Sequence, residues 1–258
     1  MKTYVVGNWK MNLSVGDASL YLHRILKRFK AARGVEVVVA PSLIAIQTLA
    51  LQLMRNKSRI RLCAQNFCQK DYGPYTGEVS VAQLKGLVNY ALVGHSERRY
   101  VFHDSDKDIR EKMAAAVRAG IRPILCIGET EMERTFGETA DVIRDQLLGG
   151  LAEVSQEDLR RCIVAYEPVW AINNNKKARL AAPDEVARSI VLIRGQLGAL
   201  YGKEIAEEVP VLYGGSVTAA TAGGYLTIPG VNGLLVGGAS LISDEFLDII
   251  DVAKRVRK

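Results

Sequence analysis

Eight short apolar segments are spread along the whole chain, and their number and spacing limit the folds that it can adopt. They are continuously apolar or β-branched rather than alternating, which is typical of strands buried on both faces of a parallel sheet. The segments occupy residues 3–7, 36–40, 60–64, 90–94, 122–127, 162–166, 210–213 and 233–236. Stretches with helical spacing separate them, so the chain alternates strand and helix.

The first of these stretches shows the helical pattern clearly. Leu22, Ile25 and Phe29 fall on one stripe, as expected for a helix that covers a core. Ser14 precedes them and can cap the helix, and Gly34 is predicted to end it.

Eight strand and helix units in 258 residues predict an α/β protein with a closed (β/α)8 barrel of eight parallel strands. An open dinucleotide-binding sheet would carry the pattern GxGxxG after its first strand, but residues 7–12 have the sequence GNWKMN. No linker and no change in composition divides the chain. We therefore expect one domain over residues 1–258.

The cysteines and the apolar windows indicate where the protein resides. The four cysteines show no CxxC pairing and no secretory leader is evident, so we expect reduced thiols and a cytoplasmic protein. The most apolar window, residues 37–54, is interrupted by Pro41 and several polar residues. We therefore expect no membrane partner.

The net charge of +6 would suit nucleic acid, a membrane surface or a small anionic substrate. Basic residues occur on helix-like faces, such as Arg24, Lys27 and Lys30, and in the last five residues. They lack the interleaved aromatic residues of a single-strand binding groove. We interpret them as solvated faces and expect no nucleic-acid partner.

Polar residues and glycines follow several of the predicted strands. In a (β/α)8 barrel, active sites form where the carboxyl ends of the strands meet. The residues are Asn8 and Lys10 after the first strand, His95, Ser96 and Glu97 after the fourth, Glu167 after the sixth, Gly214, Gly215 and Ser216 after the seventh, and Gly237 and Gly238 after the eighth. Taken singly, each also has an ordinary structural explanation.

Taken together, these residues indicate a specific chemistry. Glycines after the seventh and eighth strands let backbone N–H groups approach a phosphate. A carboxylate, a histidine and a lysine on other strands suit proton abstraction beside a carbonyl group. We find no metal-ligand cluster and no dinucleotide motif, so the sequence predicts an enzyme that acts on a small phosphorylated molecule without metal or cofactor.

Sequence strings at these positions resemble the triosephosphate isomerase family. The strings are GNWKMN (7–12), AQN (64–66), TGE (76–78), VGHSERR (93–99), CIGE (126–129), AYEPVWAI (165–172), YGGSV (213–217) and LVGGAS (235–240). The resemblance implies a TIM barrel that interconverts dihydroxyacetone phosphate and D-glyceraldehyde 3-phosphate in glycolysis and gluconeogenesis. It implies no cofactor.

The resemblance also implies roles for individual residues. Glu167 would be the base that moves the proton, and His95 would donate a hydrogen bond to the substrate oxygens. Lys10 would supply positive charge, Glu97 would contact that lysine, and Asn8 would help to position the substrate.

Further residues are implied to bind substrate or a second subunit. Ser216, Gly237 and Gly238 would bind the phosphate, and Leu235 together with Ile172 would cover the base. The segment 65–78 resembles an arm by which each subunit of a homodimer reaches its neighbour. That arm contains the interface residues Gln65, Thr76 and Glu78, and Thr76 would lie near the partner's catalytic lysine.

The chain departs from the family in the lid that follows Ile172. Residues 173–178 have the sequence NNNKKA where the family has GTGKTA, and about three further residues precede the next helix. Asn173 would take the place of a glycine whose N–H binds phosphate. This departure leaves one alternative open, a weakened or inactive phosphate-binding barrel.

Overall fold

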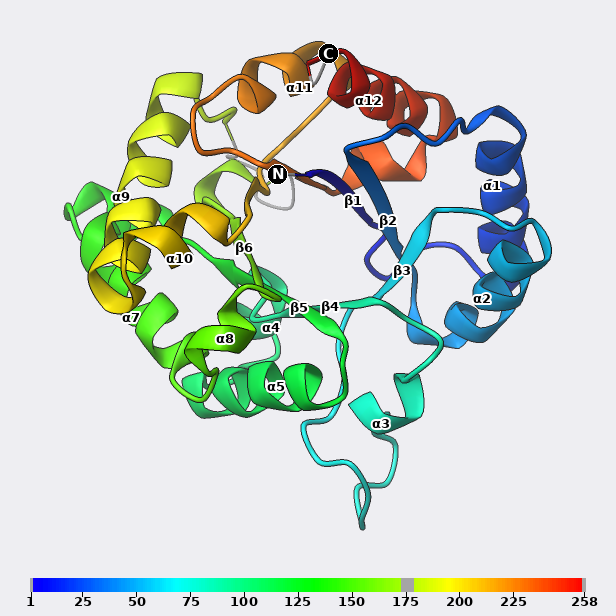
Figure 1. The fold of residues 1–258 in the computed structure, drawn as a ribbon, viewed down its shortest axis with the longest axis horizontal. Coiled ribbons are helices and arrows are strands. Elements are labelled where there is room, and N and C mark those ends of the chain that lie inside the picture. Colours follow the sequence, from blue (N-terminus) through cyan, green and yellow to red (C-terminus); the bar gives the residue numbers. More distant parts are fainter. Residues whose placement is uncertain (1, 173–178, 257–258) are drawn as a thin grey trace.

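The computed structural model describes residues 2–172 and 179–256 and shows eight parallel strands closed into a barrel in chain order (Figure 1). The strands are β1 (Thr3–Asn8), β2 (Val35–Ala40), β3 (Arg61–Ala64), β4 (Tyr90–Val93), β5 (Arg122–Ile127), β6 (Ile163–Tyr166), β7 (Val211–Tyr213) and β8 (Gly233–Val236). The predicted fold class is confirmed, and every predicted strand end lies within one residue of the observed end.

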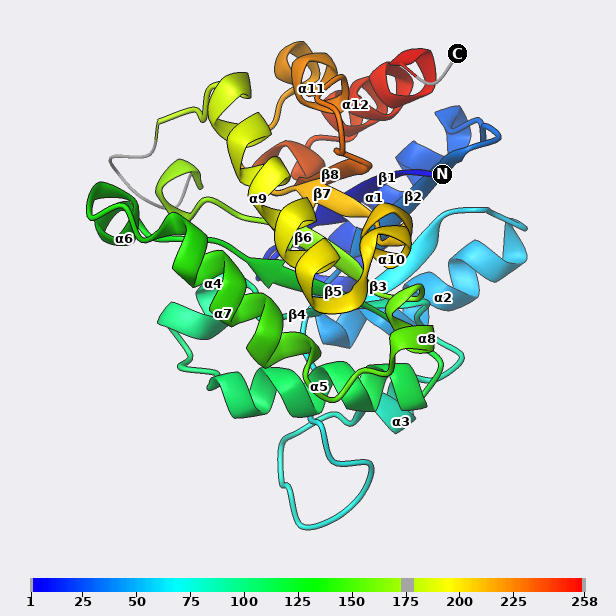
Figure 2. The ribbon, with the colours of Figure 1, turned by 60° about the vertical axis from the view of Figure 1, so that its left-hand side comes forward.

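Helices cover the outside of the barrel (Figures 1 and 2). They are α1 (Val15–Arg28), α2 (Ile46–Arg55), α3 (Val81–Leu84), α4 (Ser96–Tyr100), α5 (Asp106–Arg118), α6 (Glu131–Thr135), α7 (Thr139–Leu151), α8 (Gln156–Leu159), α9 (Pro183–Tyr201), α10 (Lys203–Glu208), α11 (Ala219–Leu226) and α12 (Ser243–Val256), with 3-10 turns η1 (Leu43–Ala45), η2 (Val169–Ala171) and η3 (Gly238–Leu241). Among the described residues, no helix has the length and apolar character needed to cross a membrane.

Helix α1 begins where the sequence predicts but ends earlier. The Ser14 side chain accepts a hydrogen bond from the N–H three residues on, which caps the first turn. The predicted end at Gly34 is wrong, because Phe29 already leaves the helical conformation and α1 stops at Arg28. Gly34 instead adopts a φ of +85° in the turn before β2, a conformation that glycine adopts readily.

Both faces of the sheet are buried, which explains why the strand segments are continuously apolar. On β1, Val6 belongs to a cluster made only of strand residues, which fills the barrel interior. Its neighbour Val5 packs in the larger cluster between the strands and the helices. Space inside is tight at β8, where a Cβ on Gly233 would lie 2.1 Å from the carbonyl oxygen of Tyr4.

The segment between β3 and α3 projects from the barrel as an arm (Figures 1 and 2). Its base is fastened to the neighbouring helix α5. The buried Lys112 donates to Asn66 at 2.9 Å and to Asp104 at 2.7 Å, and Lys70 pairs with Glu111 at 3.1 Å. Although burial opposes ionisation of Asp104, hydrogen bonds from Arg98 and Lys112 keep its pKa below the ordinary value.

Candidate active site

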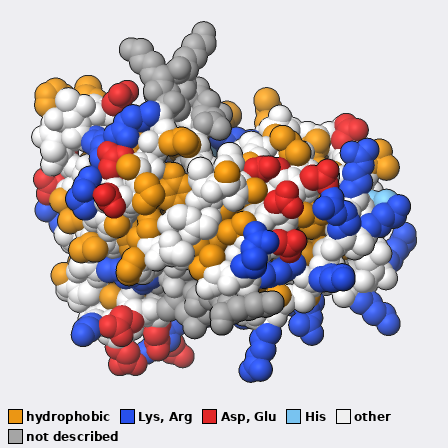
Figure 3. All heavy atoms as spheres, turned by 90° about the horizontal axis from the view of Figure 1, so that it is seen from above, with side chains coloured by type: hydrophobic (Ala, Val, Ile, Leu, Met, Phe, Trp, Pro, Cys, Tyr) orange, Lys and Arg blue, Asp and Glu red, His pale blue; other side chains and the backbone are white. Residues whose placement is uncertain are grey.

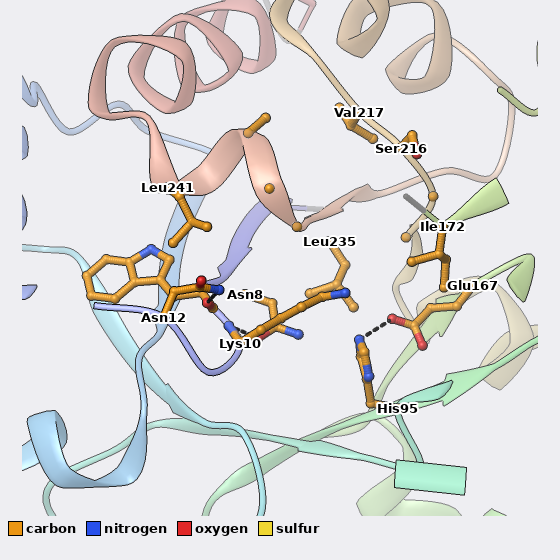
Figure 4. A pocket seen from close by; sticks show the side chains of 16 residues that line it. Asn8, Lys10, Asn12, His95, Glu167, Ile172, Ser216, Val217, Leu235 and Leu241 are labelled. Atoms are coloured by element: carbon orange, nitrogen blue, oxygen red, sulfur yellow. Dashed lines mark hydrogen bonds and ion pairs between the residues drawn. The ribbon is translucent and has the colours of Figure 1, made fainter. Parts of the chain in front are cut away.

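Side chains from five strands line one pocket at the carboxyl end of the barrel (Figure 4). The cavity has a volume of about 190 Å³. The structure brings together eleven of the residues singled out in the sequence, namely Asn8, Lys10, His95, Glu167, Ile172, Gly214, Gly215, Ser216, Leu235, Gly237 and Gly238.

The other singled-out residues lie outside the pocket lining. Glu97 Oε1 accepts a hydrogen bond from the pocket lysine at 2.8 Å. Gln65 lies beneath that lysine, whereas Thr76 and Glu78 are exposed residues of the arm. Asn173 lies outside the described residues.

Lys10 is held in an uncommon backbone conformation by contacts on both sides. Its φ is +52°, a value that non-glycine residues seldom adopt unless their surroundings enforce it. Its N–H donates to Asn8 Oδ1 at 3.0 Å, and its carbonyl accepts from Gln65 Nε2 at 2.8 Å. Gln65 also donates to the Ala40 carbonyl. From the sequence, we expected Gln65 only at a subunit interface. It follows β3 directly, however, and polar residues that directly follow barrel strands are the ones expected at the active site.

His95 stands at the N-cap of the short helix α4, which sets the direction of its ring. Its Nδ1 accepts a hydrogen bond from the Glu97 N–H at 3.2 Å. In the neutral imidazole one nitrogen accepts and the other carries the proton, so Nε2 is the donor. Nε2 lies 3.2 Å from Glu167 Oε1 (Figure 4).

Glu167 is a nearly buried carboxylate, 3% exposed. Its Oε2 accepts a hydrogen bond from the Ser96 N–H at 3.2 Å, so α4 contributes to holding both carboxylate and imidazole. The apolar side chains of Ile172 and Leu235 lie near the carboxylate in the same pocket (Figure 4).

Two glycines let the backbone and side chain of Glu167 take this position. Gly128 has a φ of +157°, and a Cβ there would lie 2.1 Å from the Glu167 carbonyl oxygen. A Cβ on Gly214 would lie 2.9 Å from Glu167 Cγ. The sequence alone did not identify the role of Gly128, because it depends on the contact between β5 and β6.

The opposite end of the pocket is lined by glycines and a serine. Turn η3 begins there at Gly238, and a Cβ on Gly237 would lie 3.9 Å from Lys10 Cε, so the lysine stem reaches this end. Ser216 donates from both its N–H and its hydroxyl to the Ala171 carbonyl, at 3.2 Å and 2.8 Å. The segment after β6 is thereby tied to the segment after β7.

A buried polar cluster supports the turn that follows Glu167. Trp170 Nε1 donates to the fully buried Glu129 at 2.9 Å, and the guanidinium groups of Arg134 and Arg179 lie 4.4 Å and 4.3 Å from the Trp170 ring. Arg179 makes two hydrogen bonds of 2.7 Å to Glu185. These bonds outweigh the opposing effect of burial and lower the pKa of Glu185 to about 2. The sequence alone did not predict this cluster, because its members come from segments that lie far apart in the chain.

The arrangement therefore offers a carboxylate that can accept a proton, an N–H donor facing it and an ammonium group nearby. In the part of the chain that the structure describes, no three His, Cys, Asp or Glu side chains are grouped as metal ligands.

Comparison with known proteins identifies the family. A family model described as triosephosphate isomerase matches residues 3–253. The chain belongs to the triosephosphate isomerase family. A triosephosphate isomerase of Chlamydia trachomatis serovar L2 is 41% identical over 96% of this chain and 89% of its own length. Those of Lactococcus lactis subsp. lactis and Thermodesulfovibrio yellowstonii are 37% and 39% identical, over 98% and 96% of this chain and 99% and 98% of their own lengths.

The match to triosephosphate isomerases runs from β1 into α12 and so includes every residue of the pocket. The resemblance drawn from the sequence is confirmed. Neither the relatives nor the geometry favours an inactive phosphate-binding barrel, since Glu167, His95 and Lys10 are all present and line one pocket.

Proposed function

We infer that this member of the family is an isomerase that interconverts dihydroxyacetone phosphate and D-glyceraldehyde 3-phosphate. The observation that carries the inference is the 3.2 Å approach of His95 Nε2 to the nearly buried Glu167 carboxylate, in a pocket that Lys10 also lines. An assay that couples dihydroxyacetone phosphate formation to its reduction tests it. Purified chain that leaves D-glyceraldehyde 3-phosphate unchanged would overturn the proposal.

We propose that Glu167 is the base. It takes a proton from C1 of dihydroxyacetone phosphate and returns it to C2, through an enediolate. Burial of the carboxylate beside Ile172 and Leu235 supports this role, because exclusion of water strengthens electrostatic interactions in the pocket. The 3.2 Å bond from the Ser96 N–H holds one oxygen while the other faces the pocket.

The negative charge of the enediolate develops on the substrate oxygens. Hydrogen-bond donors and positive charge placed beside these oxygens stabilise it. His95 Nε2 is positioned as the N–H donor because its other nitrogen is occupied by the Glu97 N–H. Lys10 supplies the positive charge and Asn8 contacts the substrate. Glu97 contributes by holding Lys10 Nζ at 2.8 Å.

We propose that the phosphate binds at the glycine end of the pocket, on Ser216, Gly237 and Gly238. Backbone N–H groups without side chains above them suit an oxyanion, and the Lys10 stem reaches this end. Asn173 stays a proposed phosphate ligand on the family resemblance alone. The reaction moves a proton within one substrate without net oxidation, so it requires no cofactor or metal.

We propose a homodimer built on the arm, with Gln65, Thr76 and Glu78 at the interface. The arm projects from the barrel and exposes 82% of Tyr72. Met11 beside the pocket is 95% exposed, and burying this apolar side chain against a second subunit would be favourable. Light scattering should give twice the chain mass for the native protein and the single mass for Thr76→Arg; a native monomer would contradict the proposal.

We also propose that residues 1–258 form one domain and that the protein resides in the cytoplasm. The four cysteines support the second point, since all are buried free thiols.

A further inference from the structure

Eight exposed cationic side chains, which we call the basic face, gather on one side of the barrel. They come from α1, from the ends of α2 and α12, and from the turns that follow α1 and α2. They are Arg24, Lys27, Lys30, Arg33, Arg55, Lys57, Arg59 and Arg255. Figure 3 shows Lys and Arg concentrated on its right side, the side on which Figure 1 places α1 and α2.

The basic face is continuous because the elements that carry it touch. Lys254 Nζ on α12 lies 5.7 Å from the Phe29 ring just after α1. Ser19 on α1 donates to Gln52 on α2 at 3.0 Å. Cations that lie far apart in the sequence therefore share one surface, which the sequence analysis could not recognise.

The cations of the basic face differ from most others in lacking carboxylate partners. Within residues 2–172 and 179–256, none of the eight forms a salt bridge, whereas two nearby carboxylates are paired with other cations, Glu36 with Lys2 and Asp251 with Lys254. Elsewhere in these ranges, only Lys85, Arg118, Arg188 and Lys203 are exposed cations without a salt bridge or side-chain hydrogen bond.

Helix stability explains only part of this pattern. Cations in the last turn of a helix interact favourably with its dipole, which accounts for Lys27, Arg55 and Arg255. Four other cations lie beyond the ends of the helices, so stabilisation of a helix dipole does not explain their presence. They are Lys30, Arg33, Lys57 and Arg59.

Aliphatic side chains are exposed among the cations of the basic face. Leu51, Met54 and Val256 are 43%, 67% and 39% exposed. A cavity of about 230 Å³ opens beside Met54, and Lys57 and Arg61 line it. Among the described residues, the exposed Tyr and Phe side chains, such as Tyr72 and Phe136, lie on other elements. The imidazole of His23 on α1 is exposed beside the cations, so bases would find one small ring here rather than a row of aromatic side chains. Cations mixed with aliphatic side chains suit the boundary between lipid headgroups and acyl chains.

Although the sequence alone led us to expect no membrane partner, we propose that the basic face docks on a membrane surface of anionic phospholipids. It attracts the headgroups by charge and places Met54 and Leu51 at the acyl boundary. The turns that carry Lys30, Arg33, Lys57 and Arg59 lie at the amino end of the barrel and the pocket lies at its carboxyl end, so the docked protein keeps its pocket open to water. This proposal is independent of the catalytic assignment.

Sedimentation with vesicles tests the proposal. The full chain is mixed with vesicles of phosphatidylcholine alone or of equal parts phosphatidylcholine and phosphatidylserine. Native protein should bind only the vesicles with phosphatidylserine, and about 1 M salt should release it, because the screening length then falls to about 3 Å. The triple variant Lys30→Glu, Arg33→Glu and Lys57→Glu should lose at least about tenfold in affinity.

A matched variant controls for net charge. Arg118→Glu, Arg188→Glu and Lys203→Glu together change the charge equally at exposed unpaired cations outside the basic face. This control should bind like the native chain, and unchanged isomerase activity should show that both variants fold. Equal loss in both variants, no vesicle binding by native protein, or binding to poly(U) RNA but not to vesicles would each overturn the proposal.

Discussion

His95 Nε2 lies 3.2 Å from Glu167 Oε1, and both side chains are almost completely buried. The two residues come from different strands, yet the first turn of α4 fixes both of them: the Glu97 N–H binds the imidazole and the Ser96 N–H binds the carboxylate. Base and donor are thereby held on one side of the same pocket before any substrate enters.

Glu167→Asp should lower kcat by about 100-fold, because the shorter side chain withdraws the carboxylate by roughly 1 Å from its position beside the substrate carbon. KM should change little, since the phosphate contacts are retained. Steady-state kinetics measure both constants, with the exposed Glu157→Asp as control. A Glu167→Asp enzyme as fast as the native one would remove Glu167 from the role of base.

Lys10→Met should raise KM for both triose phosphates by about tenfold or more. The substitution keeps the length of the side chain but removes a charge-assisted interaction worth about 1.5–3 kcal/mol, and 1.4 kcal/mol corresponds to tenfold in binding. Lys85→Met removes the same charge from an exposed site and should leave KM unchanged. Equal KM values in the two variants would show that Lys10 acts only through net charge.

Gly128→Ala should destabilise the fold and slow the enzyme. The added Cβ would lie 2.1 Å from the Glu167 carbonyl oxygen, so backbone must move, at a cost of about 1–3 kcal/mol beyond the unfavourable φ. Gly86→Ala provides the control, because Gly86 has a φ of +84° with no atom near the new Cβ and should cost only about 1–2 kcal/mol. Urea unfolding gives both values. If Gly128→Ala lowers the free energy of unfolding no more than Gly86→Ala does and keeps the native kcat, the close contact between Gly128 and Glu167 does not constrain the site.

The Glu185 carboxylate should make stability depend on acid pH. Its pKa falls from 4.5 to about 2 in the folded protein because Arg179 binds the ionised form. The ionised Glu185 therefore stabilises the folded state fully above pH 4.5, and this contribution is lost as the pH drops toward 2. The difference in unfolding free energy between native protein and Glu185→Gln should shrink over this range, and urea unfolding at several pH values measures it. A difference that is constant with pH would contradict the assignment.

The sequence predicted the strands well because each is a local run of apolar residues, and it placed the pocket residues because barrel strands share one carboxyl end. It did not predict features that depend on contacts between distant segments. Gln65 supports Lys10 from 55 residues away, and Arg255 shares a surface with Lys30. The early end of α1 was missed for a different reason, since the backbone at Phe29 departs from the helix without a glycine there.

Isotope exchange shows whether the Glu167 carboxylate carries the transferred proton. Dihydroxyacetone phosphate is incubated in D2O with native protein or with Glu167→Gln, and the products are followed by NMR. We expect D-glyceraldehyde 3-phosphate with deuterium at C2 from the native protein, because the proton on the carboxylate exchanges with solvent, and almost no conversion by Glu167→Gln. Unchanged substrate with the native protein, product without solvent deuterium, or native-like conversion by Glu167→Gln would contradict it.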